Sequence, residues 1–406
     1  MQGSEASVRV IDHQRVHHNP YPNHRPESYS GTTICRVPDR AGRPVLLCGF
    51  RLGSARMSPD GGVPLYRSDD DGTSWTRIPS PLEATPNMPA SELPPAHPRA
   101  GRAALAGPHL GASAAGTLLL TAARMWITEP GAPDWDDAAA GLTDADSVIV
   151  RGTLEDGWEA PRIIDARRHP DEWAIPCGPP LHVGGQRWVF PLERHGRAYM
   201  PRWLERYHAL AALSPDDGRT WPEMPPMLND PTGRIAHYDQ RVSLLADGRI
   251  ASLVWAHDVV TDVTLPARVG WSADGGHTWT GDLDTSIIGG PVNTVALRDG
   301  RLLAAYARRT APRGIRACVS ADGGATWSTD QELVIFDEAS GEVVGELATV
   351  HDRREADAGL WGSMWGWTFG QPMPIALDDG MAGLVFFGVG PDRAPAVHFV
   401  RLAIDG

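Results

Sequence analysis

An eight-residue pattern, Ser-x-Asp-x-Gly-x-Thr-Trp, constrains the fold of this chain more than any other feature. Four copies occur, at Ser68–Trp75 (with Ser74 in the Thr position), Ser214–Trp221, Ser272–Trp279 and Ser320–Trp327, and a shortened copy is present at Glu155–Trp158. The Asp can accept hydrogen bonds from turn amides, the Gly supplies a positive φ, and the Trp can bury its ring beside the turn. The pattern therefore predicts a repeated folding element, not a catalytic group.

A second periodicity consists of an apolar run, a short Gly-containing turn and another apolar run. It is found at Ile34–Phe50, Ala103–Ala123, Leu181–Leu192, Val242–Trp255, Val292–Ala307 and Ile375–Gly388. Gly and Asp-Gly between alternating apolar runs are strong hairpin signals. Six similar hairpins predict six similar structural units.

The octapeptide resembles the Asp-box of the sialidase-like β-propellers, and the resemblance covers essentially the whole chain. With the six hairpins it implies an all-β, six-bladed propeller with four-stranded antiparallel blades, in a single domain over residues 1–406. A strand expected at Ser7–Ile11 has no hairpin partner nearby and is expected to join the last blade and close the ring. His17–His24 is expected to be a surface loop, and residues 337–366 a long loop or lid.

Composition and charge exclude several classes of partner. The net charge is −13 and no basic run exists, so neither nucleic acid nor an anionic membrane is expected to bind. The sequence shows neither the pattern of a signal peptide nor an apolar stretch long enough to span a bilayer, which predicts a cytoplasmic protein. Cys35, Cys48, Cys177 and Cys318 lack metal-ligand spacing and are expected to be buried free thiols. No cofactor is expected, and the oligomeric state is not predicted.

Polar residues gather where the first strand of each hairpin begins or the second ends. They include Arg36, Arg51, Arg102, Arg124, Trp126, Glu193, Arg194, His195, Tyr238, Asp239, Arg241, His257, Asp258, Asn293, Arg308, Arg309, Arg313, Trp365, Trp367 and Gln371. In a propeller these positions meet at one rim, opposite the Asp-Gly turns. The rim is therefore the expected functional face, although single strand ends are also often polar because they are solvated.

The resemblance to sialidases implies an anion site on this rim. Cys35-Arg36-Val37-Pro38 resembles the family motif whose arginine binds the substrate carboxylate, and Arg51 resembles the arginine that ends the next strand. Arg313 resembles a further family arginine ahead of the fifth-blade octapeptide. Arg36 and Arg313 are expected to lack an internal acid and to bind an incoming carboxylate or sulfate.

The same resemblance implies catalytic positions. Asp239 stands eight residues before Asp247, where the family has the glutamate that activates the nucleophile, and Asp60 is a displaced candidate for the family's catalytic aspartate. Gln371 stands where the family has its tyrosine nucleophile. Because an amide cannot replace a phenol as nucleophile, the usual retaining sialidase mechanism is not expected.

The residues left at the rim allow several chemistries. Asp239 and Glu193 from neighbouring blades could flank a glycosidic bond as acid and carboxylate, whereas an internal Asp239–Arg241 ion pair is the structural alternative. The candidates for catalysis are Asp239, Glu193, His257 and Asp60, and those for substrate binding are Arg36, Arg51, Arg241, Arg308, Arg313, Trp126, Trp365 and Gln371. The sequence predicts an exo-acting glycoside hydrolase for an acidic or decorated terminal sugar. A lyase with His195 or His257 as base, and a non-catalytic glycan-binding propeller, are the alternatives.

Overall fold

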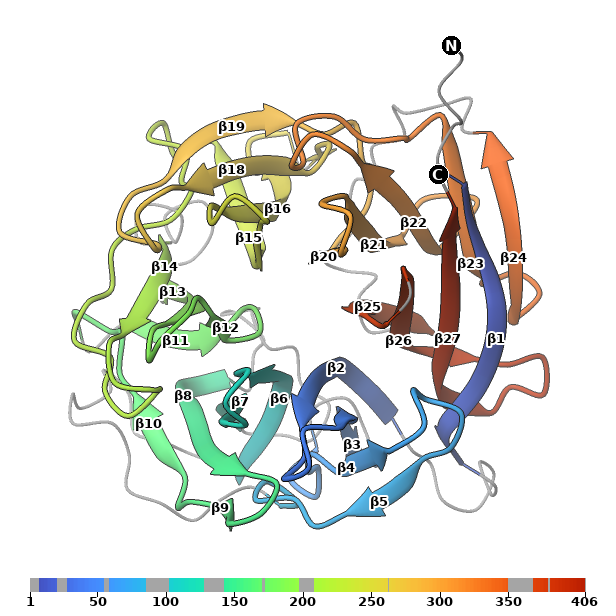
Figure 1. The fold of residues 1–406 in the computed structure, drawn as a ribbon. Coiled ribbons are helices and arrows are strands. Elements are labelled where there is room, and N and C mark those ends of the chain that lie inside the picture. The colour runs from blue at the N-terminus through green and yellow to red at the C-terminus, as the bar shows by residue number, and fades with distance from the viewer. Residues whose placement is uncertain are drawn as a thin grey trace.

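The computed structural model describes residues 7–19, 28–54, 58–84, 102–127, 142–169, 172–196, 208–261, 263–349, 368–378 and 380–405. These residues form six small antiparallel sheets arranged in a ring, with the first strand of each inner hairpin nearest the ring axis (Figure 1). The all-β, six-bladed propeller expected from the sequence is confirmed. Within this described part the structure has no helix that could cross a membrane.

The blades follow the chain in order. Blade one contains β2 (Ser28–Pro38), β3 (Pro44–Gly53), β4 (Leu65–Ser68) and β5 (Thr76–Ile78). Blade two contains β6 (Arg102–Ala112), β7 (Leu118–Ile127), β8 (Leu142–Thr153), β9 (Gly157–Trp158) and β10 (Arg162–Ile164). Blade three contains β11 (Glu172–Pro176), β12 (Leu181–His182), β13 (Trp188–Gly196) and β14 (His208–Ser214). All six predicted hairpins are present as paired inner strands, and in blade three β11 extends the inner edge beyond the predicted β12–β13 hairpin.

The other three blades complete the ring. Blade four contains β15 (Ile235–Leu244), β16 (Ile250–Asp258), β17 (Val263–Thr264), β18 (Arg268–Ser272) and β19 (Thr280–Asp284). Blade five contains β20 (Val292–Ala296), β21 (Leu302–Arg308), β22 (Gly314–Ser320), β23 (Gln331–Asp337) and β24 (Glu342–Thr349). Blade six contains β25 (Phe369–Ala376), β26 (Met381–Val389), β27 (Pro395–Asp405) and, from the other end of the chain, β1 (Ser7–His18).

Strand β1 closes the ring, as predicted, but it is longer than expected. It pairs antiparallel with β27 from Ser7 opposite Asp405 to His18 opposite Ala396. His17 and His18 therefore belong to a strand instead of the predicted loop, and His17 Nδ1 is hydrogen-bonded to the Tyr66 hydroxyl at 2.8 Å. Asn19 follows the strand and donates its amide to the Pro395 carbonyl at 3.3 Å, and residues 20–24 of the predicted loop lie outside the described residues.

The segment expected to be a long loop after residue 337 begins differently. Its first part forms the β23–β24 hairpin, which gives blade five a fifth strand. The alternating apolar residues of Glu342–Thr349 suit such an edge strand. Residues 350–367 lie outside the described part of the chain.

The four octapeptides share one hydrogen-bonding pattern. In the third copy, Gly276 N donates to Ser272 Oγ at 2.8 Å, and the amide and hydroxyl of Thr278 donate to the Asp274 carboxylate at 2.9 and 2.6 Å. The same bonds recur in the other copies. The Trp rings, expected to be buried, are only partly buried in all four copies.

The core lies between the blades. Each of the six interfaces between neighbouring blades holds its own cluster of buried apolar side chains. All four cysteines are buried and free, as predicted. Burial raises the pKa of Cys35 to about 12, so that thiol stays protonated at neutral pH.

Candidate active site

The ring has two faces that the hairpins distinguish. We call the face where the inner strands β2, β6, β11, β15, β20 and β25 begin the start face, and the face with the hairpin turns that follow them the turn face. Most sequence-predicted site residues lie toward the start face: Arg51, Asp60, Trp126, Glu193, His195, Asp239, Arg241, His257, Arg308, Arg313 and Gln371. Trp365 and Trp367 lie outside the described residues.

Four of the inner strands carry a bulge at the same level of the ring. The register shifts lie between Ser30 and Thr33, Ala106 and His109, Tyr238 and Arg241, and Gly370 and Met373. The residue in the left-handed conformation is Gly31 in blade one and Gly107 in blade two, but Asp239 (φ 54°) in blade four and Gln371 (φ 46°) in blade six. Glycine adopts this conformation without a steric penalty, whereas Asp and Gln do not. Asp239 and Gln371 therefore occupy strained positions next to the ring axis.

Hydrogen bonds between neighbouring blades fix the bulges of blades four and six. Glu193 of blade three accepts a bond from the Asp239 amide at 2.5 Å. Asn293 of blade five accepts from Arg241 Nε at 2.8 Å and donates to the Pro372 carbonyl of blade six at 2.7 Å. One asparagine thus links the bulge segments that contain Asp239 and Gln371.

The bonds continue around the axis into the remaining blades. Thr32 of blade one donates its hydroxyl to the Gln371 carbonyl. The Leu110 amide of blade two donates to Thr33 Oγ1 at 2.8 Å, and Ser147 of blade two donates to the Ala174 carbonyl of blade three at 3.1 Å. Every blade is therefore joined to its neighbours near the axis by at least one such bond.

Asp239 is a partly exposed carboxyl group with a raised pKa. Its side chain is 28% exposed, and its Oδ1 lies 2.9 Å from Nη2 of the buried Arg241. Burial and the nearby Glu193 carboxylate raise the pKa of Asp239, against the lowering effect of Arg241. A carboxyl group with a raised pKa can hold a proton for donation.

Glu193 lies directly beside Asp239, so the structure brings this predicted carboxyl pair together. Its second oxygen, Oε2, lies 3.2 Å from His195 Nε2, and the imidazole stacks on Trp173 with ring centres 4.3 Å apart. Glu193 is buried, with each carboxylate oxygen engaged. We therefore assign Glu193 to positioning Asp239 and raising its pKa.

His109 is an axial residue that sequence analysis missed. It lies on β6 directly after the bulge at Gly107 and is 2% exposed. Burial and the positive charge of Arg241 hold the pKa of His109 well below its usual value, so the ring is neutral. A histidine within an otherwise apolar strand, just after Gly-Pro, was the only available sequence signal.

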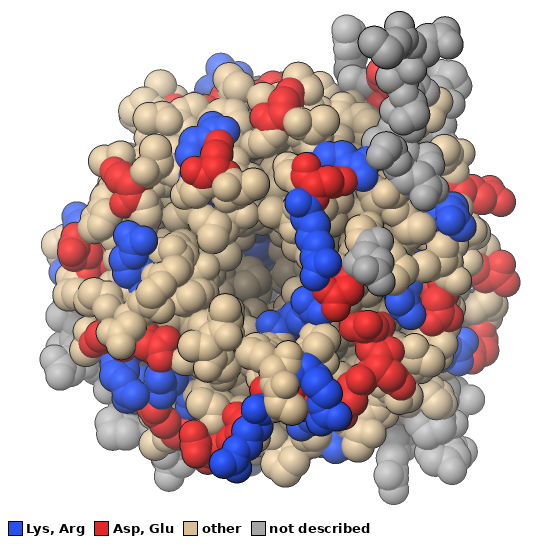
Figure 2. Space-filling model, viewed as in Figure 1, with Lys and Arg blue, Asp and Glu red and all other residues tan. Residues whose placement is uncertain are grey.

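The predicted anion site is not formed as expected, because both of its arginines have internal partners. Arg36 lies at the turn-face end of β2, where Asp378 binds it at 2.5 Å and also binds Arg298 at 2.5 Å. Arg313 is on the start face, 3.1 Å from Glu338. Figure 2 shows a hollow at the centre of the ring with basic side chains beside it; these are arginines because the chain has no lysine.

Three further candidates for substrate binding are packed into the blades. Arg51 is fully buried and donates to the Leu105 carbonyl at 3.0 Å, which joins blade one to blade two. Arg308 is buried 3.8 Å from Glu332. The Trp126 ring, expected to stack on a sugar, lies 4.5 Å from the Arg124 guanidinium.

The other two candidates for catalysis lie apart from the axial bonds described above. His257 is fully buried in β16, and the following Asp258 is paired with Arg234 at 2.7 Å instead of with His257. The bond from Arg234 holds the pKa of Asp258 at about 2. Asp60 is exposed in the loop after β3, where hydrogen bonds from Ser58 and Ser54 lower its pKa.

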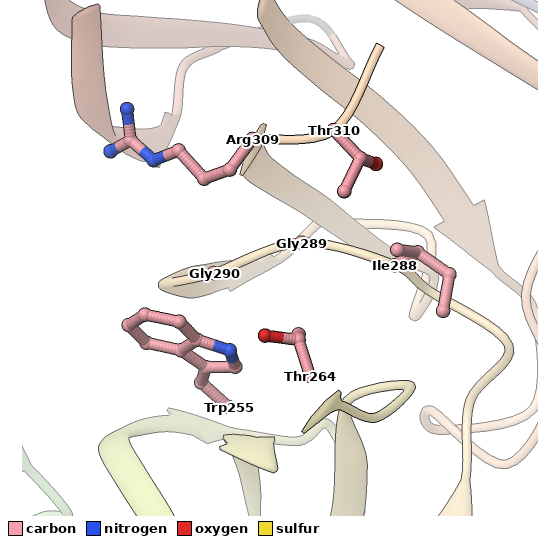
Figure 3. Close-up of a pocket in the computed structure, with 7 residues that line it drawn as sticks. All are labelled: Trp255, Thr264, Ile288, Gly289, Gly290, Arg309 and Thr310. Carbon is pink, nitrogen blue, oxygen red and sulfur yellow. The ribbon is translucent and has the colours of Figure 1, made fainter. Parts of the chain in front are cut away.

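A small pocket between blades four and five flanks the axial residues. It is lined by Trp255, Thr264, Ile288, Gly289, Gly290, Arg309 and Thr310. In Figure 3 the Trp255 indole nitrogen and the Thr264 hydroxyl face the same space, whereas the Arg309 guanidinium points away. Trp255 pairs with Tyr238, next to Asp239, and Arg309 donates to the Phe369 carbonyl, two residues from Gln371. The pocket therefore borders both strained bulges.

Comparisons with known proteins agree with the fold. Neither a family model nor a curated protein matches the chain. A Dyadobacter fermentans protein of unknown function is 18% identical, with a TM-score of 0.66, and the match covers 98% of this chain and 99% of that one. A Penicillium chrysogenum α-L-arabinanase is 14% identical with a TM-score of 0.54, over 96% and 98% of the two chains.

A Trypanosoma rangeli sialidase, solved with the inhibitor DANA, is a further structural neighbour. It is 12% identical to this chain with a TM-score of 0.58, and the match covers 92% of this chain. This chain spans about half the length of that sialidase, because the match covers 55% of it. At these identities the similarities establish the propeller fold.

Proposed function

We propose that this protein is a glycoside hydrolase that removes a terminal sugar, with Asp239 as its general acid. The observation that carries the proposal is a partly exposed carboxyl group with a raised pKa, held in a strained conformation at the axis of a propeller. Strained residues with shifted pKa values are typical of catalytic sites. The sialidase and arabinanase neighbours, whose fold this chain shares, support a carbohydrate-active function.

In the proposed mechanism, protonated Asp239 donates its proton to the glycosidic oxygen as the bond to the leaving group breaks. Glu193 and Arg241 have opposite effects on the pKa of Asp239: the carboxylate favours the protonated form and the guanidinium favours the ionised form. Gln371 offers no nucleophile, so we propose that a water molecule attacks the anomeric carbon directly. Its oxygen forms the new C–O bond as the bond to the leaving group breaks, and it releases its proton to a second water molecule. That route inverts the anomeric configuration, which NMR of the first product would show.

The proposal does not require an acidic sugar. Arg36 and Arg313, the arginines expected to bind a substrate anion, are already paired with Asp378 and Glu338. We also propose that the four octapeptides are Asp-boxes of the sialidase-like kind, on the basis of their common hydrogen bonds. They stabilise the propeller and do not take part in the reaction.

The test compares leaving groups in the Asp239→Asn variant. We expect this variant to lose about 10²- to 10⁴-fold in kcat/KM on phenyl and alkyl glycosides, which have poor leaving groups. It should retain most activity on 2,4-dinitrophenyl glycosides, because a good leaving group needs no proton. The panel contains neutral, uronic acid and sialic acid glycosides, and Asp71→Asn is the matched control because Asp71 has a φ of 53° in an octapeptide.

Other outcomes would contradict the proposal. An equal loss of kcat/KM on glycosides with poor and with good leaving groups would show that Asp239 is not the general acid. An unsaturated uronate as product would indicate a lyase, and sugar binding without turnover of any substrate would indicate a glycan-binding propeller.

A further inference from the structure

Gln371 is the less expected of the two strained residues at the axis. The described residues with a positive φ other than glycine are Asp71, Asp217, Asp239, Ser286, Gln371 and Arg393. Asp and Ser can offset part of the strain because their short side chains hydrogen-bond locally, but Gln is longer. At the same bulge position, blades one and two have Gly31 and Gly107. Glutamine at this position carries a conformational cost that glycine would avoid, so its presence requires an explanation.

A comparison with Asp217 shows what a structural explanation looks like. Asp217 is also strained, and its carboxylate accepts bonds from Thr117, Arg151 and Trp188. The Gln371 side chain, in contrast, makes no hydrogen bond within the described part of the chain, and the side-chain bond that reaches its backbone carbonyl comes from the Thr32 hydroxyl. It is partly exposed beside the axis. Its amide is therefore available to a ligand.

We infer that Gln371 is a substrate-contacting residue whose amide binds hydroxyl groups of the sugar held beside Asp239. This inference rests on the proposed function for the identity of the ligand. An amide donates through its nitrogen and accepts through its oxygen, which matches a pair of neighbouring hydroxyl groups. Glycine at position 371 would relieve the backbone strain but would also remove the contact with the sugar. A role in binding therefore explains why a glutamine occupies this strained position.

Asn293 gives this contact a fixed position relative to the acid. It binds Arg241, the partner of Asp239, and the carbonyl of Pro372, which follows Gln371. Thr32 holds the Gln371 carbonyl from the other side. The acid of blade four and the amide of blade six are thus oriented by the same residue of blade five.

The experiment measures stability and sugar binding together in Gln371→Gly and Gln371→Ala. Gln371→Gly relieves the strain, so its Tm should equal or exceed that of the parent by about 1–2 °C, whereas Gln371→Ala should melt lower than Gln371→Gly. Both variants should raise KM for the hydrolysed glycoside, or Kd for a bound monosaccharide, about tenfold. Arg393→Gly is the matched control, because Arg393 is an exposed residue with a φ of 58° in the β26–β27 turn. It should match or exceed the parent in Tm without changing KM.

The binding probes are the panel glycosides and free arabinose, galactose, glucuronic acid and sialic acid. A lower Tm in Gln371→Gly would overturn the inference, because the side chain would then be structural. Unchanged KM and Kd in both variants, or no binding of any probe to the parent, would also overturn it. Hydrolysis that depends on Asp239 with no effect at Gln371 would leave the proposed function intact, and weakened binding at Gln371 without any hydrolysis would refute that function alone.

Discussion

At the scale of single residues, the pKa of Asp239 depends on its burial and on two neighbouring charged groups with opposite effects, Arg241 and Glu193. Arg241 is almost completely buried, and it donates to Asp239 at 2.9 Å and to Asn293 at 2.8 Å. Glu193 approaches the same aspartate through the backbone amide. A buried charge at hydrogen-bonding distance has a much larger effect on a neighbouring pKa than an exposed one.

Replacing Arg241 with Gln should raise the pKa of Asp239, because it removes the positive charge that favours the ionised form. The alkaline limb of the kcat profile, where the acid loses its proton, should move up by about 1 pH unit. Glu193→Gln removes a negative charge and should move the limb down. The measurement is kcat against pH on a substrate with a poor leaving group. If the alkaline limb shifts in the same direction in both variants, or shifts in neither, Asp239 does not control it.

Sequence reasoning located Asp239 and Gln371 because each stands at a constant distance from an Asp-Gly turn. It misplaced Arg36, because β2 begins at Ser28 in a polar stretch that does not look like a strand, so Arg36 lies near the end of β2. It also could not see counterions on other blades, such as Asp378, 342 residues from Arg36. Thr32, His109 and Trp173 were missed because only the closed ring brings them to the axis.

At the scale of structural elements, the octapeptide joins blades as well as forming a turn. Its glycine packs against the preceding blade in each copy: Gly72 against Phe399, Gly218 against Leu119, Gly276 against Val189 and Gly324 against Val269. The same glycine has a positive φ in all four copies. The conformation therefore favours glycine in all four copies, and close packing also requires it at Gly72 and Gly218, where a Cβ would lie 2.0 Å from Phe399 and 2.8 Å from Leu119.

Replacing Gly72 with Ala should lower the free energy of unfolding by about 3 kcal/mol, from backbone strain and overpacking together. A Cβ at this position would lie 2.0 Å from the Phe399 ring, with φ at 90°. Gly248→Ala is the control, because its φ is 85° but a Cβ would meet nothing within 4 Å. It should cost about 1 kcal/mol. Urea unfolding measures both, and equal losses would show that packing against blade six contributes nothing.

The hairpins and octapeptides were predictable because they depend on local sequence, namely turn residues between alternating apolar runs. The bulges were not, because one extra residue in a strand leaves the pattern on either side unchanged. The β23–β24 hairpin was also missed. Its turn, around Ser340-Gly341, joins strands that carry several acidic residues, so the segment resembled a polar loop.

At the scale of the whole molecule, the ring depends on one seam between the two ends of the chain. Strand β1 supplies the outer strand of blade six, so the other three strands of that blade come from the far end of the sequence. Within the seam, His13 Nε2 is hydrogen-bonded to His398 Nδ1 at 2.9 Å, and His398 stacks on Phe386. One imidazole must donate and the other accept, so the pair requires at least one neutral ring.

This seam should make stability depend on pH in the range where histidines titrate. Burial, followed by the charge of His13, lowers the pKa of His398 to about 3, and burial also lowers the pKa of His13. Below pH 6.5, the ordinary pKa of histidine, His398 binds a proton in the unfolded chain but not in the folded protein. The stability that depends on neutral His398 is therefore fully present above about pH 6.5 and falls as the pH drops toward 3. Through His398 alone, the free energy of unfolding should fall by about 2 kcal/mol between pH 7 and pH 5.

The measurement is urea unfolding at pH 7 and at pH 5 in the parent and in His398→Gln, which keeps a hydrogen-bonding group opposite His13 but cannot be protonated. The parent should lose more stability than the variant by about 2 kcal/mol, while His109, whose pKa is also lowered, contributes equally to both. Carboxylates such as Asp274, with a pKa of about 2, act below this range. His277→Gln, an exposed histidine of the third octapeptide, should retain the parent's pH dependence. If His398→Gln retains it as well, protonation within the seam does not limit the stability of the ring.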